Sequence, residues 1–383
     1  MSAQTQQGDY DPRTLSVKNR FSQNTLKAMA KPFIGVTMDG QVQPGLYPVH
    51  ATGVSTRPVV MAAAEFLATL KSYQKVRSVY SVEDPEWRRW SNVDVGIFAR
   101  QGISLKEMSD GQRETAMKLM RESLSAKGLQ LSMDIMKTDQ ALREINEDIL
   151  SFDEDQYFFK ILGLPSTTEP WGWQVNGHHL LISYFVLGDQ VVMSPTFLGG
   201  EPVNIKTGKY AGTRILQQEQ DFGLAMMRSL KEEQREAATL AADKLHNNNQ
   251  GEANKDNLVL NFEGVPVTGF SDKQKQQLLE LVELFVGNMR QGHADIRMEE
   301  IVAHLDNTWF AWVGDVTDDA VFYYRIHSPV VLIEFDHQIP VGTSILNPQD
   351  KPIRDHIHVV IRTPNGNDYG KDLLRQHLEH HAH

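Results

Sequence analysis

The spacing of apolar residues changes along the chain, and this change separates predicted helices from predicted strands. Four segments carry apolar side chains three or four positions apart, as in an amphipathic helix: residues 58–76, 109–124, 131–150 and 271–285. Two of them begin with a Ser-x-x-Gln capping box, at Ser109 and Ser271, in which each side chain bonds a free backbone N–H. The two boxes indicate shared helix-start chemistry, and the spacing of such starts is too irregular for a solenoid.

Strand-like runs lie in two clusters among these helices. In the first cluster, Asn176-Gly177 is a hairpin signal, His178 and His179 begin the next strand, and residues 188–190 turn into a further strand. The second cluster contains four runs: 309–313, 321–326, 330–336 and 356–362. Strand clusters beside helical blocks, without β-α-β alternation, predict an α+β fold with a mainly antiparallel sheet flanked by helical segments.

Length and composition fit a single large domain. The 383 residues are 40% hydrophobic, which is enough for a sizeable core. We expect residues 1–24 to form a flexible N-terminal arm and residues 25–383 to form one α+β domain, with a mobile loop in the Asn-rich stretch 245–257. No apolar run approaches ~18 residues, and the N-terminus has no apolar signal region. These features predict a cytoplasmic protein that does not enter a membrane.

Charge and residue types exclude several classes of function. A net charge of −11 repels phosphate backbones, so we expect no nucleic-acid partner. The absence of cysteine removes disulfides, thiolate metal sites and cysteine nucleophiles. The chain also lacks the Gly-x-Ser-x-Gly, Gly-x-x-x-x-Gly-Lys, Gly-x-Gly-x-x-Gly and His-Glu-x-x-His motifs. The remaining candidate chemistry therefore rests on histidines and carboxylates.

Two predicted neighbouring strands carry pairs with the spacing of metal ligands. His356 and His358 are two residues apart on the last strand, so both rings face the same side. Glu334 and Asp336 have the same spacing on the preceding strand. Imidazole and carboxylate groups without thiolate suit iron, copper, zinc or manganese. We predict a metal site here, with Glu334 or Asp336 as a carboxylate ligand or general base.

Further histidines could complete this site. Neighbouring strand residues point to opposite faces, so we expect only one of His178 and His179 to reach it. On the closing helix, His377 and His381 are four residues apart and share a face. We expect this helix to fold back, so that these two histidines serve as ligands or orient the ligands.

A structural interpretation of the same residues remains open. Histidine pairs often cap strands or meet solvent, and Glu334 and Asp336 could form ion pairs with arginines such as Arg362. The last residues, Leu378-Glu-His-His-Ala-His383, also resemble a histidine tag, although Ala382 interrupts the run.

The motifs resemble a bacterial and fungal family catalogued as domain of unknown function 3500. The resemblance rests on Trp171-Gly-Trp-Gln-x-x-Gly-His-His-Leu180, Pro195-Thr-Phe-Leu-Gly-Gly-Glu-Pro202, Ile333-Glu-Phe-Asp336, His356-Ile-His-x-Val-x-Arg362 and Asn367-Asp-Tyr-Gly-Lys-Asp-Leu-Leu-Arg-Gln-His377. It extends from about Pro32 to the end of the chain and implies that the terminal histidines are native. The family name carries no activity.

We therefore expect a metal-dependent enzyme that acts on a small organic substrate. Iron or copper, and hence an oxygenase or oxidase, is favoured over a zinc hydrolase. We expect Trp87, Trp171, Trp173 and Arg362 to shape the substrate pocket. The contrasting interpretation is a non-catalytic protein that binds a metal or a small molecule. The substrate, the metal and the formation of a homo-oligomer stay open.

Overall fold

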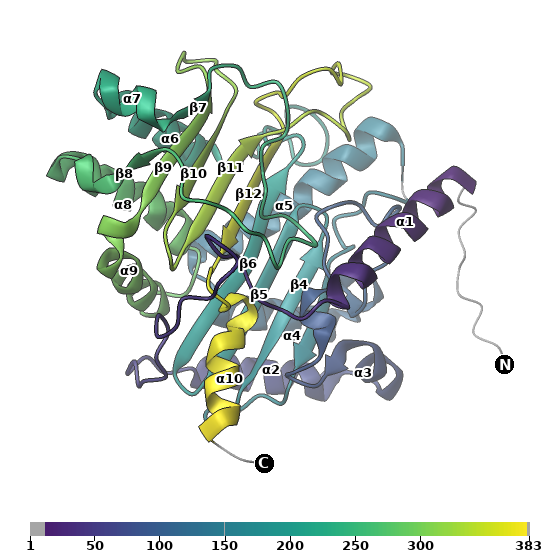
Figure 1. The fold of residues 1–383 in the computed structure, drawn as a ribbon. Helices are drawn as coiled ribbons and strands as arrows, with labels where there is room; N and C mark the ends of the chain where they lie inside the picture. The colour runs from purple at the N-terminus through teal and green to yellow at the C-terminus, as the bar shows by residue number, and fades with distance from the viewer. Residues whose placement is uncertain (1–11, 149, 381–383) are drawn as a thin grey trace.

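The computed structural model describes residues 12–148 and 150–380 as an α+β fold around one large sheet (Figure 1). Within these residues the sheet has 12 strands, most of them antiparallel. Its main path runs β1-β3-β4-β5-β6-β12-β11-β10-β9-β7, with β2 paired to β3 and β8 paired to β9. The predicted fold class is confirmed.

The fold consists of two halves with the same order of helices and strands, and each half contributes its strands to the sheet. The first half contains α2 (Arg57–Thr69), α3 (Ser72–Ser78), β1 (Val79–Tyr80), β2 (Ile103–Ser104), η2 (Leu105–Glu107), α4 (Asp110–Ser123), α5 (Ala126–Asn146), β3 (Phe158–Leu162), β4 (Trp171–Gly177), β5 (Leu180–Leu187) and β6 (Gln190–Gly200). The second half contains α6 (Gln217–Ser229), α7 (Glu232–Ala238), β7 (Thr239–Ala241), β8 (Val265–Pro266), η3 (Val267–Gly269), α8 (Asp272–Val286), α9 (His293–Ala303), β9 (Trp309–Gly314), β10 (Phe322–His327), β11 (Leu332–His337) and β12 (Ile357–Arg362). Outside this repeat lie α1 (Pro12–Met29), η1 (Pro85–Arg88), η4 (Leu305–Asn307), η5 (Asp368–Gly370) and α10 (Lys371–His380).

Strand pairing follows the same repeat. β1 pairs with β3 in parallel, as β7 does with β9, and the antiparallel pair β6–β12 joins the halves. Two copies of one unit give this order when their last strands pair across an approximate two-fold axis. Even the polar contacts match. Gln112 Nε2 donates to Thr69 O at 2.9 Å, and Gln274 Nε2 donates to Ser229 O at 2.9 Å. The two Ser-x-x-Gln boxes therefore mark an internal repeat and not helix-start chemistry alone.

The two faces of the sheet have different covers. Helices α2, α4, α5, α6 and α8 lie behind the sheet in Figure 1, whereas loops, η5 and the start of α10 lie in front. On the helical face, Trp173 donates to Ser123 of α4, and Tyr324 donates to a carbonyl of α6. On the loop face, the ring of Phe185 packs against Gly370. The loop face carries the candidate site. No helix in the described ranges is long and apolar enough to span a membrane.

Part of the predicted flexible arm is a helix. Residues 12–29 form α1, and Arg88 donates to the carbonyls of Ala28 and Met29 at its end and to that of Lys31 beyond it. Burial of the Arg88 guanidinium ties the helix to the domain, which the polar composition of this segment did not indicate. Residues 1–11 lie outside the described part of the chain.

The Asn-rich segment 245–257 is hydrogen-bonded to the sheet, although it forms neither helix nor strand. Asp336 accepts the N–H groups of Asn248 and Asn249, and Glu334 accepts those of Gln250 and Gly251. Composition predicted a mobile loop because asparagine and glycine bury little apolar area. In the structure, buried carboxylates bond the segment to the sheet, and its mobility stays a prediction.

Candidate metal centre

His178 and His179 form the turn between β4 and β5. Gly177 pairs with Leu180, which leaves the two histidines as a two-residue hairpin loop, and His179 adopts a left-handed φ of 58°. The predicted turn at Asn176-Gly177 and the predicted strand at the histidines are therefore wrong by two residues. Gly177 is the last residue of β4, and the Tyr157 ring packs where a side chain at this position would lie.

A row of residues across three strands brings the histidines together. His179 lies next to Gly199 of β6, whose N–H donates to His179 O at 2.9 Å, and Gly199 pairs with His358 of β12. Neighbouring strands are about 4.8 Å apart, so the backbones of His179 and His358 are separated by roughly 10 Å. Because Gly199 has no side chain, the two rings can approach each other above β6. A Cβ there would lie 3.4 Å from the His179 ring.

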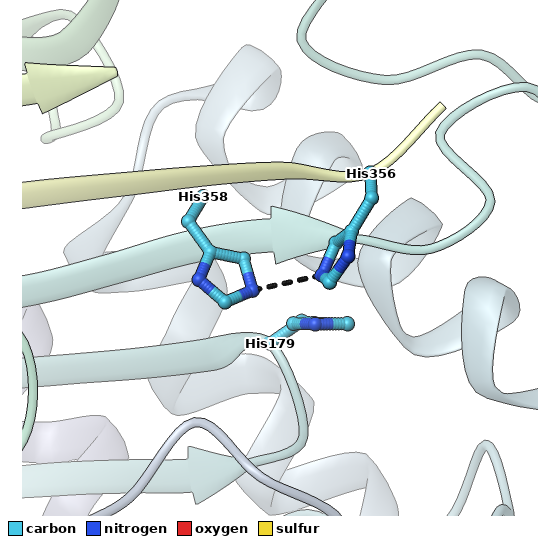
Figure 2. A group of neighbouring side chains, drawn as sticks. All are labelled: His179, His356 and His358. Carbon is cyan, nitrogen blue, oxygen red and sulfur yellow. Dashed lines mark hydrogen bonds between the residues drawn. The ribbon is translucent and has the colours of Figure 1, made fainter. Parts of the chain in front are cut away.

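His179, His356 and His358 form one buried cluster (Figure 2). Each offers a ring nitrogen, and these nitrogens all lie within 4.8 Å of one another. The residues are only 3%, 3% and 7% exposed. Figure 2 shows His356 and His358 reaching down from one strand and His179 approaching from a turn on the other side. The structure thus brings together three of the six predicted histidine ligands.

Hydrogen bonds fix the tautomers of two of these rings. His356 Nδ1 lies 2.8 Å from Ile339 O, which can only accept, so Nδ1 carries the proton. His358 Nδ1 lies 2.7 Å from the Glu252 carboxylate and donates to it in the same way. In the neutral rings, both Nε2 atoms then carry lone pairs, and they face each other at 3.0 Å. Two such lone pairs repel unless a proton or a metal ion lies between them.

The electrostatics of the cluster favour neutral rings at His356 and His179. Burial lowers the pKa of His356 to about 4. Burial, reinforced by the neighbouring imidazoles, holds the pKa of His179 well below its usual range. His179 Nδ1 is also buried without a hydrogen-bond partner in the described residues. Neutral imidazole with a free lone pair is the form that binds metals, so the three residues fit a metal ion.

Three carboxylates that sequence reasoning missed support the cluster. Glu252 orients His358, and a Glu201 oxygen lies 3.3 Å from His356 Nδ1. Asp139 bonds His178 Nδ1 at 2.6 Å, and the His178 ring stacks on His179 with centroids 3.9 Å apart. A signal existed for Asp139, since it lies on the apolar face of α5. Glu252 gave none, because it lies in the Asn-rich segment.

Comparison with protein families matches residues 52–371 to the family described as protein of unknown function (DUF3500). The chain belongs to this family. The expected resemblance is therefore confirmed, and the matched range contains all three clustered histidines. Comparisons with curated proteins and with solved structures give no match for this DUF3500 protein.

Glu334 and Asp336 lie on the same sheet face as His358 but do not join the three-histidine group. Besides binding segment 245–257, Glu334 accepts a hydrogen bond from Tyr323 at 2.8 Å. Asp336 lies 3.0 Å from the Lys244 ammonium. Burial raises the pKa of Asp336 to about 6, although Lys244 opposes this shift. Their carboxylates are thus turned toward the covering segment. Spacing alone assigned them a ligand role because it indicates the face of the sheet but not the partner.

The C-terminal helix does not bring His377 to the cluster. His377 Nε2 lies 3.4 Å from Glu169, just before β4, whereas the cluster lies after the end of β4. A seven-residue strand spans roughly 23 Å, so the expected completion of the site by this helix is wrong for His377. His380 is exposed at the helix end, and His381 lies outside the described residues.

The predicted pocket residues are buried in the core. Trp87, Trp171 and Trp173 are all 0% exposed, and each indole N–H bonds a protein oxygen. Arg362 is equally buried and forms ion pairs with Asp256 and Asp368. These four side chains hold the fold of the DUF3500 protein together, so sequence reasoning assigned to a substrate pocket what belongs to packing.

Proposed function

We propose that His179, His356 and His358 bind one divalent metal ion and that the protein is a metal-dependent enzyme acting on a small organic substrate. The observation that carries this proposal is the pair of Nε2 lone pairs facing each other at 3.0 Å in rings whose tautomers are fixed. Three protein ligands leave a coordination position open, which is typical of catalytic rather than structural metal sites.

The ligand type favours iron or copper, with zinc or manganese as alternatives. A redox metal would supply oxygenase or oxidase chemistry, and zinc would supply an activated water for hydrolysis. Three neutral imidazoles leave the full charge of a divalent ion uncompensated. The nearby carboxylates Glu201, Glu252 and Asp139 offset part of that charge without replacing a ligand.

The chain's own residues would orient the ligands and exclude water. Ile339 O and Glu252 fix the ring planes of His356 and His358, as carboxylates and carbonyls commonly do for metal-bound histidines. The carboxylate of Glu201 accepts the N–H groups of Val341, Gly342 and Thr343, and so holds segment 338–355 beside the cluster. This segment and segment 245–257 together bury the site.

A second candidate is a non-catalytic metal-binding protein. The burial of all three histidines favours it, because a substrate must displace part of the cover to reach the metal. For either candidate we place the protein in the cytoplasm, since a chain without cysteine fits a reducing compartment. A homo-oligomer is compatible with both.

Metal analysis of untagged protein, purified without a nickel column, tests the proposal. We expect about one equivalent of iron, copper, zinc or manganese per chain. His358→Ala should lose the metal, and His380→Ala, which changes an exposed histidine, should retain it. Cobalt added to metal-free protein should give a visible absorption band that His358→Ala lacks. A protein that neither retains metal nor binds cobalt would overturn the proposal. For a protein that does bind metal, oxygen uptake with candidate substrates would separate an oxidase from a binding protein.

A further inference from the structure

Two segments cover the candidate metal centre, and they are anchored differently. Segment 245–257 is bonded to Glu334 and Asp336, which are both 0% exposed. Arg362 is equally buried and donates to two carbonyl oxygens of this segment, at 2.7 and 3.0 Å. Hydrogen bonds to charged groups are stronger than those between neutral groups. This segment is therefore the harder of the two covers to displace.

The other cover is residues 339–347, a strap between β11 and β12 (Figure 1). Its anchor is the carboxylate of Glu201, which is 1% exposed. This carboxylate accepts the N–H groups of Val341, Gly342 and Thr343, and it accepts the hydroxyl of Thr343 at 2.6 Å. One side chain thus fastens three successive residues of the strap.

Little apolar burial holds the strap in place. Neutral hydrogen bonds add to the Glu201 anchor: the Asn146 side chain donates to Gly342 O at 2.8 Å, and the Ile339 N–H donates to the Asn247 side chain at 2.9 Å. Three large apolar side chains of the strap are 64–65% exposed: Val341, Ile345 and Leu346. Segments with few buried apolar contacts open first in local unfolding. The strap should therefore open more readily than segment 245–257.

The strap is also joined directly to one of the proposed metal ligands. His356 Nδ1 donates to Ile339 O at 2.8 Å, and a Glu201 oxygen lies 3.3 Å from the same nitrogen. An imidazole that binds a divalent ion through Nε2 becomes a stronger donor at Nδ1, and the groups that accept from Nδ1 orient the ring. Closure of the strap and metal binding should therefore favour each other, by the same factor in both directions.

We propose that the strap 339–347 is a gate over the metal centre and that Glu201 is its latch. The gate opens to admit the metal ion and the substrate, and it closes when the ion is bound. This inference rests on the proposed metal site and adds a route of entry to it. It reconciles the burial of the three histidines with a substrate that must reach them.

Hydrogen exchange of backbone amides, followed by mass spectrometry of the full-length protein, tests the gate with zinc as the probe. In the metal-free protein, the strap should exchange faster than segment 245–257 does. Zinc should slow exchange in the strap about tenfold. Unchanged exchange in the strap of a protein that has bound zinc would overturn the gate and leave the metal site standing.

Thr343→Val tests the latch, because it removes the hydroxyl that Glu201 accepts and leaves the charge unchanged. This variant should release zinc to a chelator about tenfold faster than the unchanged protein. Thr343→Ser, which keeps the hydroxyl, should restore slow release. Thr308→Val is the matched control, since Thr308 is 1% exposed and donates its hydroxyl to His304 O at 3.0 Å, just before β9. Its zinc release should be unchanged.

Thermal unfolding of each variant checks that the fold persists. Zinc release at the unchanged rate from folded Thr343→Val would overturn the gate, as would an equal acceleration in Thr308→Val. A failure of the unchanged protein to bind zinc would overturn the metal site and the gate together.

Discussion

Gly199 is the residue whose substitution should most sharply separate metal binding from folding. It lies between His179 and His358 in the row across the sheet. A Cβ at this position would lie 2.7 Å from Ile357 O, in the backbone of the strand that carries His358, and 3.4 Å from the His179 ring. Because a backbone oxygen cannot rotate away, Gly199→Ala must shift β12 relative to β6.

Overpacking of this kind costs about 1–3 kcal/mol of the free energy of unfolding. With an unfolding entropy of ~2 cal/mol/K per residue, this corresponds to a loss of about 1–4 °C in the unfolding temperature. The same shift moves His358 away from His179, so we expect metal affinity to fall at least tenfold, or ~1.4 kcal/mol. The change in affinity should thus be large in a protein that still folds.

Gly200→Ala is the matched control. Its Cβ would point to the helical face and meet Ile215 Cδ1 at 2.6 Å, the end of a flexible side chain that can move. Chelator competition measures metal affinity for both variants, and calorimetry of the metal-free proteins measures stability. We expect a loss of affinity only for Gly199→Ala. Equal affinities for the two variants would refute the inference that the rings meet above Gly199.

Three further predictions concern other contacts. Asp139→Asn should weaken metal binding about 10–100-fold, because it loosens the stack on His179; cobalt titration measures this, and an unchanged affinity would contradict it. Glu334→Gln should make segment 245–257 the first site of limited proteolysis, because a neutral amide accepts its N–H groups more weakly; an unchanged cleavage pattern would argue against this role. Burial lowers the pKa of His327 to about 3, so the unfolded chain binds a proton below about pH 6.5 that the folded protein does not. The free energy of unfolding should therefore fall as pH decreases from about 6.5 toward 3. His327→Gln should reduce the loss between about pH 6.5 and pH 4 by about 3 kcal/mol, and urea unfolding at these two pH values measures it.

The sequence predicted the features that depend on neighbours along the chain. The capping boxes at Ser109 and Ser271 begin helices as expected, because a cap needs only a side chain and a backbone N–H three residues apart. The i, i+2 spacing placed His356 and His358 on one face for the same local reason. The turn at residues 188–189 and the α+β class followed from local signals too.

Only the tertiary structure decided which groups meet. His179 and His358 are 179 residues apart, and no local pattern indicates that β6 lies between their strands with a glycine at the crossing point. The carboxylates show the same limit. Glu334 and Asp336 have the spacing of ligands, but segment 245–257 supplies N–H donors that turn them away from the cluster. Spacing fixes the face on which a side chain lies, whereas packing between distant segments fixes its partner, and a metal site depends on both.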